Sequence, residues 1–203
     1  TVMGKVLGDR LLVATHNRGK LEEIAALLSS FGVAVVSAAD MGLPEPLETE
    51  TTFVGNARLK AHAAAQATQL PALADDSGIC IDALGGAPGV FTADWAETGS
   101  GRDFNQAMTR AWHALQAAGA PEPRKAQFRC TLVLAWPDGE DAVFEGVVHG
   151  RFVWPMRGTG HGYDPIFQPD GDTRTFGEMS FAEKNETSHR ADAFRKFVEA
   201  CFT

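Results

Sequence analysis

The chain has 203 residues, 44% of them hydrophobic and 22% charged, which is ordinary for one soluble globular domain with a full core. Its formal net charge of −8 argues against non-specific binding to a polyanion such as DNA, but permits a small phosphorylated ligand in a local basic pocket. No apolar stretch approaches the ~20 residues of a membrane span, and no signal peptide is expected. The three cysteines form no CxxC pair, so we expect reduced thiols in a cytoplasmic protein and no zinc site.

Hydrophobic periodicity predicts alternating strands and helices in the first half of the chain. The expected elements are strands at 10–15, 33–36 and 72–74 and helices at 21–28 and 52–67. A loop rich in Pro and acidic residues occupies 40–51. The acidic pair Asp75-Asp76 follows the third strand, and an apolar run at 79–81 can continue that strand.

The second half of the chain is dominated by an expected antiparallel hairpin. Its strands lie at 127–136 and 142–152, with a Pro-Asp-Gly turn between them. Helices are expected at 103–118 and from about 190 to 202, and Ser180 with Glu183 has the form of a capping box. The pattern therefore predicts an α/β fold with a mixed sheet and flanking helices.

A polar turn between the first strand and the first helix reads Thr15-His16-Asn17-Arg18-Gly19-Lys20. Backbone N–H groups at a helix N-terminus bind anions, and Lys20 adds a positive charge. The turn resembles a Walker A loop but fails its pattern, because Ala14 and Leu21 replace the required Gly and Ser or Thr. It predicts a phosphate site, or else an ordinary turn capped by Asn17.

Three acidic side chains, Glu48, Asp75 and Asp76, are candidates for a metal site. Mg²⁺ takes oxygen ligands and usually uses one or two carboxylates beside phosphates and water. Two adjacent acids directly after a buried strand are costly unless they are paired or bind a metal. The alternative is an Asx turn, in which one aspartate caps its own backbone before Gly78.

The Ala-rich helix carries two polar side chains, Asn56 and Lys60, one turn apart on one face. Lys60 either extends to the phosphates of a ligand or carries its ammonium group to solvent along an apolar stem. The helix alone does not distinguish these alternatives.

Two later segments carry groups that suit a nucleotide. In Gly160–Pro165, the ring of His161 or Tyr163 can stack on a base, and Asp164 can accept hydrogen bonds from ring N–H groups. In Glu183–Arg190, basic side chains gather before the last helix, where Ser188 is a candidate N-cap. The alternatives are an ordinary Gly/Pro turn and a solvated charged turn.

In combination and in this order, the segments resemble the inosine/xanthosine triphosphate pyrophosphatases, which remove non-standard purine nucleotides. The resemblance covers about residues 10–202. Its most specific runs are Asp75-Asp76-Ser77-Gly78, Gly162-Tyr163-Asp164-Pro165-Ile166-Phe167 and Ser188-His189-Arg190.

The resemblance implies an elongated mixed sheet with flanking helices, forming one domain over residues 1–203. This domain would have two lobes with the active-site cleft between them, as in ITPase-like and Maf-like proteins. The family further implies Mg²⁺ as cofactor, a homodimer, and no nucleic-acid or membrane partner. The implied reaction converts ITP, dITP or XTP to the monophosphate and pyrophosphate.

The functional positions of the family carry over residue by residue. Asp76 becomes the catalytic acid and binds the metal together with Glu48. The phosphate-binding residues become Thr15, His16, Asn17, Arg18, Gly19 and Lys20, with Lys60 as a further candidate. The remaining substrate contacts become Ser77, His161, Gly162, Tyr163, Asp164, Lys184, His189 and Arg190.

Two positions depart from the family pattern. Phe usually precedes the Gly-Tyr-Asp run, where this chain has His161. An imidazole also stacks, but its protonation would make base binding depend on pH. Glu often precedes Asn56, where this chain has Gly55, so one acidic group is missing and Glu48 gains weight as a metal ligand.

In the expected mechanism, Asp76 orients and deprotonates a water that attacks the α-phosphorus, and Lys20 and Lys60 stabilise the departing pyrophosphate. Donors from Lys184 or Arg190 facing the 6-keto group would disfavour adenine. Three other interpretations remain: a pyrophosphatase of similar fold for standard or modified pyrimidine nucleotides, a non-catalytic nucleotide sensor, and a weaker one, a Ser-His-Asp acyl hydrolase without a GxSxG elbow.

Overall fold

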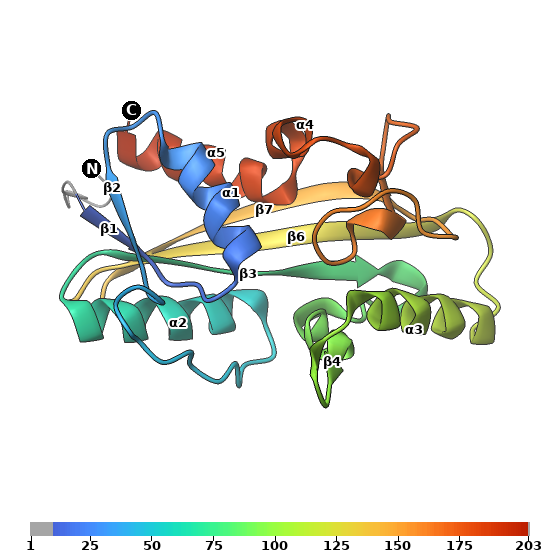
Figure 1. Cartoon of the computed structure of the whole chain (residues 1–203), viewed down its shortest axis with the longest axis horizontal. Coiled ribbons are helices and arrows are strands. Elements are labelled where there is room, and N and C mark those ends of the chain that lie inside the picture. Colours follow the sequence, from blue (N-terminus) through green and yellow to red (C-terminus); the bar gives the residue numbers. More distant parts are fainter. Residues whose placement is uncertain (1–9, 203) are drawn as a thin grey trace. The chain divides into compact units, whose positions relative to one another are not determined.

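The computed structural model describes residues 10–202 of the chain (Figure 1). The expectation about a signal peptide concerns an N-terminal segment outside this range. Contacts divide the chain into two compact units. Unit 1 holds the described residues up to Asp76, then Cys130–Gly146, then those from Arg190 onward; unit 2 consists of Ser77–Arg129 and Val147–His189.

A six-stranded sheet runs through the fold in the order β2-β1-β3-β6-β7-β8. Its strands are β1 Arg10–Val13, β2 Ala34–Ser37, β3 Ala72–Ile81, β6 Arg124–Ala135, β7 Asp141–Phe152 and β8 Phe167–Pro169. The first strand pairs in parallel with β2 and β3, whereas β7 and β8 are antiparallel. The mixed sheet is therefore confirmed.

The predicted hairpin consists of β6 and β7, which are neighbours in the sheet. A hydrogen bond of 2.9 Å from the backbone N–H of Trp136 to the carbonyl of Glu140 closes the turn between them. So short a connection joins antiparallel strands, because a parallel pair needs a crossover of a dozen residues or more. A separate antiparallel pair, β4 Glu97–Thr98 with β5 Gly101–Arg102, was not predicted.

In unit 1, helices cover both faces of the sheet (Figure 1). On one face lie α1 Arg18–Leu28 and α5 His189–Phe202, and on the other lies α2 Phe53–Thr68. Because successive strand residues point to opposite faces, Leu11 and Val13 join the cluster under α1 and α5, whereas Leu12 packs with the alanines of α2. The small side chains of α2 let this helix approach the sheet closely.

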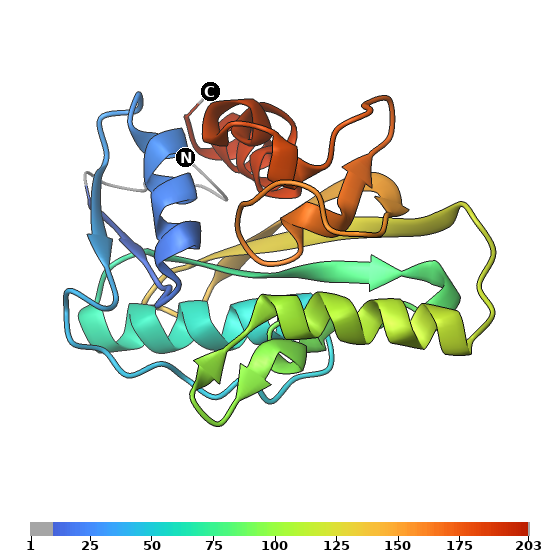
Figure 2. The same ribbon diagram turned by 45° about the vertical axis from the view of Figure 1, so that its right-hand side comes forward.

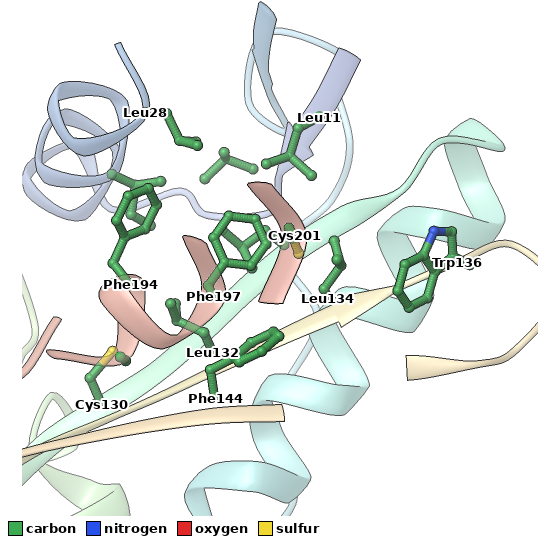
Figure 3. Close-up of a cluster of buried hydrophobic side chains, with 14 residues drawn as sticks. Leu11, Leu28, Cys130, Leu132, Leu134, Trp136, Phe144, Phe194, Phe197 and Cys201 are labelled. Carbon is green, nitrogen blue, oxygen red and sulfur yellow. The ribbon is translucent and has the colours of Figure 1, made fainter. Parts of the chain in front are cut away.

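The cluster beneath α1 and α5 is rich in aromatic rings (Figure 3). The fully buried ring of Phe197 lies 5.5 Å from that of Phe194 and 5.6 Å from that of Phe144, centroid to centroid. Phe194, Phe197 and Cys201 are the buried part of the inner stripe predicted for the last helix, and Val198 is partly buried beside them.

Unit 2 has its own core, built on α3 Phe104–Ala117. This helix is the yellow-green one in Figure 2. Met108, Ala111 and Leu115 of this helix pack with Ile79 and Ile81 of β3. The segment after β7 adds Tyr163 and Phe167 among other buried side chains. A short helix, α4 Phe181–Thr187, begins at the predicted capping box: the Ser180 side chain accepts from the Glu183 backbone and Glu183 accepts from that of Ser180.

Two local predictions were wrong. The acidic pair does not follow a strand that ends at residue 74 but lies inside β3, which continues through Gly78 to Ile81. This position also excludes the Asx turn, because hydrogen bonding between strands outweighs the turn propensity of Asp, Ser and Gly. The alternative of a solvated charged turn at Glu183–Arg190 is also wrong, because most of this segment belongs to α4 and Lys184 is buried within it.

No helix among the described residues is long and apolar enough to cross a membrane. All three cysteines are free thiols, as expected for reduced cysteines. Burial raises the pKa of Cys130 to about 12 and that of Cys201 to about 11.

Truncation of Phe197 to Ala tests the aromatic cluster of unit 1. We expect the free energy of unfolding to fall by about 3–5 kcal/mol, because a large ring leaves a cavity that the neighbours fill only in part. Chemical denaturation measures this change. The half-exposed Phe181 is the matched control, and its replacement by Ala should cost about 1 kcal/mol or less. Equal losses in both variants would contradict this account of the core.

The thiols should differ in reactivity, because the thiolate is the reactive form. At pH 8, a disulfide reagent should modify the half-buried Cys80 first, and Cys130 and Cys201 only after unfolding in guanidinium. Counting released chromophore against time gives the order. Rapid modification of all three thiols in the folded protein would contradict it.

Candidate functional site

The polar turn 15–20 forms the N-terminus of α1, as predicted. Asn17 is the N-cap: its side-chain oxygen accepts from the backbone N–H of Lys20 at 3.1 Å. Thr15 is buried, and its hydroxyl accepts from the backbone N–H of Asn17 at 3.1 Å. The exposed His16 bonds through Nε2 to the carbonyl of Leu43 at 2.8 Å. The first N–H groups of the helix have no acceptor one turn back, so this end suits an anion.

Asp75 lies in a buried network of charges in unit 1. Its Oδ2 is 3.2 Å from Nζ of Lys20 and 3.3 Å from a guanidinium nitrogen of Arg190. The same guanidinium also pairs with Glu23 of α1. Burial alone would raise the pKa of Asp75, but Lys20 and then Arg190 lower it well below its usual range. Asp75 therefore stays ionised and links β3 to α1 and α5.

Asp76, the next residue, points toward α2. Its Oδ2 accepts a hydrogen bond of 3.2 Å from the side-chain amide of Asn56. Burial raises the pKa of Asp76 to about 7 against the opposing effect of Lys60, and the carboxylate of Glu48 adds to the rise. The two aspartates thus have different electrostatic surroundings: Asp75 is paired directly with two cations, whereas the pKa of Asp76 is raised by burial and by a second carboxylate.

Glu48 and Lys60 form an ion pair beside Asp76, with Oε1 and Nζ 2.8 Å apart. Burial lowers the pKa of Lys60, but Asp75, Glu48 and Asp76 together raise it. The ammonium of Lys60 thus lies beside carboxylates, which contradicts the expectation that it extends to solvent. Its contact with the phosphates of a ligand stays a prediction. Only 11% of this side chain is exposed.

The carboxylates of Asp76 and Glu48 fit a divalent cation. Within residues 10–202, no three His, Cys, Asp or Glu side chains form a ready-made metal cage. Mg²⁺ does not need one, because it usually takes one or two carboxylates together with phosphate oxygens and water. Burial and then the Glu48 carboxylate disfavour the charged form of Asp76 and raise its pKa, and a bound cation would favour that charged form.

In unit 2, the predicted nucleoside-binding residues fall into two kinds. Asp164 and Lys184 form a buried ion pair of 2.7 Å, and the same Asp164 oxygen accepts from the backbone N–H of His161 at 3.2 Å. The side chain of His161 is exposed, between two glycines with positive φ, at +119° for Gly160 and +59° for Gly162. These groups are brought together.

Tyr163 and His189 are parts of the core of unit 2. The Tyr163 hydroxyl donates to the carbonyl of Thr92 at 2.8 Å, and its ring meets Phe104 edge-on. His189 stacks on Phe128, with ring centroids 4.8 Å apart and planes 12° apart. Ser77 lies half-buried in β3, directly after Asp76.

The structure adds two buried side chains that were missing from the predicted site. Glu23 completes the network around Arg190, and Asn56 bonds Asp76. An acid next to Ile24 on an amphipathic helix gives no sequence signal, because its partner Arg190 is 167 residues away. Asn56 carried a signal, its place one turn before Lys60, but that spacing did not reveal a bond to Asp76.

The fold and these clusters define a class: an α/β protein with a cationic helix N-terminus beside paired carboxylates on one mixed sheet. Such an arrangement suits a phosphorylated ligand that is held together with a divalent cation.

Comparison with known proteins identifies the family. Residues 11–200 match the model of the Ham1 family. A dITP/XTP pyrophosphatase of Ruegeria pomeroyi is 71% identical over 196 residues, which cover 96% of each chain. One of Agrobacterium fabrum is 56% identical, covering 98% of this chain and 99% of its own. A HAM1 protein of Coxiella burnetii has a solved structure that matches with a TM-score of 0.86 and 36% identity, over 94% of this chain and 96% of its own.

The chain belongs to the Ham1 family. The resemblance to the inosine/xanthosine triphosphate pyrophosphatases is thereby confirmed.

Replacement of Glu23 by Gln tests the buried network. We expect the free energy of unfolding to fall by about 3 kcal/mol, because the buried guanidinium of Arg190 loses one of its two carboxylates. The neighbouring Glu22 is exposed on the same helix and serves as control, with a change within about 0.5 kcal/mol on replacement by Gln. Chemical denaturation that shows no difference between the two variants would refute a stabilising role for Glu23.

Proposed function

We propose that this protein hydrolyses dITP, ITP and XTP to the nucleoside monophosphate and pyrophosphate, and so clears non-standard purines from the nucleotide pool. The chain is an enzyme of the nucleoside triphosphate pyrophosphatase class. The observation that carries the assignment of roles is the contrast between Asp75, which is neutralised by two cations, and Asp76, which is not.

Asp76 is the proposed catalytic group. As a carboxylate it orients the attacking water toward the α-phosphorus and accepts its proton. Asp75 does not do this work, because Lys20 and Arg190 already bind its charged oxygen. The N–H groups at the start of α1 and the ammonium groups of Lys20 and Lys60 stabilise the negative charge of the triphosphate and of the departing pyrophosphate.

Mg²⁺ is the proposed cofactor, held by Asp76 and Glu48. When bound, it supplies positive charge to the phosphate oxygens. The ion pair between Glu48 and Lys60 supports this role, because it holds a carboxylate near Asp76 and keeps an ammonium group beside both.

Purine selection is proposed to depend on the ion pair of Lys184 and Asp164. Hypoxanthine and xanthine present a 6-keto acceptor next to an N–H donor, and the pair offers a donor and an acceptor 2.7 Å apart. Adenine reverses both groups. Lys184 is a better candidate than Arg190 for reading the keto group, since the Arg190 guanidinium bonds two carboxylates in unit 1. Ser77, His161, Gly162, Tyr163 and His189 complete the proposed substrate contacts.

The remaining proposals follow from the family. The chain forms a single catalytic domain of two lobes, and it acts as a homodimer in the cytoplasm, where the nucleotide pool is. We propose no nucleic-acid or membrane partner, in keeping with the net charge of −8.

Replacement of Asp76 by Asn tests the catalytic assignment. We expect kcat for dITP to fall by a factor on the order of 10²–10⁴, the contribution of a positioned acid–base group, while nucleotide affinity stays within a few-fold. Pyrophosphate release and nucleotide titration measure the two quantities. A variant with near-normal kcat would exclude Asp76 as the catalytic group.

A substrate panel tests the proposed selection of the base. With Mg²⁺ present, kcat/KM for dITP and XTP should exceed that for ATP by factors up to about 10⁴–10⁵, because buried groups that bond a keto group are left unpaired against adenine. Pyrimidine nucleoside triphosphates in the same panel separate this enzyme from a pyrimidine-directed relative. Equal turnover of ATP and dITP would contradict the proposal.

A further inference from the structure

Asn56 is a buried amide that contacts two different parts of unit 1. Its Oδ1 accepts a hydrogen bond of 2.9 Å from the backbone N–H of Glu50. Its Nδ2 donates to the carbonyl of Glu50 at 3.3 Å and to Oδ2 of Asp76 at 3.2 Å. Only 2% of the residue is exposed. One side chain thus joins the loop at residues 40–51, called the acidic loop below, to β3, the strand that carries Asp76.

These bonds fix the orientation of the amide. The Glu50 backbone N–H can only donate, so it requires the oxygen of the Asn56 side chain on its side. The nitrogen must then face Asp76. Its bond engages one carboxylate oxygen of Asp76, and the second oxygen stays outside this bond.

Gly55, the residue before Asn56, leaves room for the loop at the start of α2. A Cβ at this position would lie 2.8 Å from Cβ of Glu50 and 2.9 Å from Oγ1 of Thr52, closer than real Cβ atoms approach such neighbours. Thr52 is the N-cap of α2, and its hydroxyl accepts from the backbone N–H of Gly55 at 3.0 Å. The acidic loop therefore rests directly on the first turn of the helix.

We infer that Asn56 is a positioning residue that holds the acidic loop, which carries Glu48, in a fixed place relative to Asp76. We also infer that Gly55 leaves the space in which this loop packs against α2. The inference rests on the proposed function, because it assigns Glu48 and Asp76 to one reacting centre. Glu48 lies two residues before Glu50, so the hydrogen bonds between Asn56 and the Glu50 backbone restrict where the Glu48 carboxylate can reach. Groups that orient ligands or catalytic carboxylates in this way typically contribute 10–100-fold to activity or metal affinity.

Two variants test the role of Asn56 and the role of Gly55 separately. Replacement of Asn56 by Asp keeps the acceptor for the Glu50 N–H, removes the donor to Asp76 and to the Glu50 carbonyl, and places a second carboxylate beside Asp76. We expect kcat for dITP to fall by about 10–100-fold while KM stays within about threefold. Replacement of Gly55 by Ala keeps the amide but forces the loop to move. We expect it to weaken binding of Mn²⁺ to the nucleotide-free protein by about tenfold, measured by electron paramagnetic resonance.

Gln66 provides the matched control. It is an exposed residue of the same helix whose side-chain amide donates one hydrogen bond, to the carbonyl of Pro137 at 2.9 Å. Replacement of Gln66 by Ala should leave kcat, KM and Mn²⁺ affinity unchanged. Thermal unfolding of each variant separates a loss of fold from a loss of position, because a purely structural role for Asn56 or Gly55 would lower the melting temperature without changing the other readouts.

The outcomes distinguish this inference from the proposed function. A slow Asp76→Asn enzyme together with an Asn56→Asp enzyme of normal kcat would overturn the positioning role alone. Unchanged Mn²⁺ affinity in Gly55→Ala would overturn the role of Gly55 in placing the loop, even if Asn56→Asp did not fold. An Asp76→Asn enzyme with full activity would instead overturn the proposed function.

Discussion

The alternation of side chains along β3 is the constraint on which the rest of the site depends. Leu73 and Asp75 point to the face covered by α1 and α5, whereas Ala74 and Asp76 point to the face covered by α2. Two adjacent carboxylates therefore enter different environments without any special backbone geometry. A buried charge costs several kcal/mol unless it is paired, so each carboxylate needs stabilising partners on its own face of the sheet.

The partners of Asp75 differ in kind from those of Asp76. Asp75 is paired with Lys20 of α1 and Arg190 of α5, and the second carboxylate on Arg190, Glu23, also comes from α1. This network ties the N-terminal half of α1 to the strand. Asp76 has only a neutral amide as its bonded partner among the described residues, with Glu48 and Lys60 nearby. The ion pairs of Asp75 make this part of unit 1 rigid, whereas the surroundings of Asp76 leave its carboxylate available for chemistry.

Local signals in the sequence were sufficient for most of the helices, the hairpin and the helix caps. The cap at Asn17, the capping box at Ser180 and the hairpin that follows residue 124 each depend on residues close in sequence, and the structure contains all three. The family resemblance named both Asp76 and Lys60, and the structure places the two groups near enough for each to shift the pKa of the other. Their joint role in a site stays a prediction.

Other features could not be read locally, because they depend on partners far along the chain. The continuity of β3 through the acidic pair comes from neighbouring strands, against the turn propensity of the sequence. Arg190 meets Asp75 across 115 residues, and this pairing, together with that of Lys20, neutralises Asp75 and not Asp76. Tyr163 looked like a stacking ring by its glycine neighbours, but its ring lies in the core of unit 2.

The division of labour between the two aspartates leads to one central claim, that a water held by Asp76 attacks the α-phosphorus. Hydrolysis of dITP in oxygen-18 water, followed by mass spectrometry of both products, tests this claim most directly. The account requires one pyrophosphate for each dITP, with the label in dIMP and none in pyrophosphate. Label in pyrophosphate, or release of single phosphates, would contradict it.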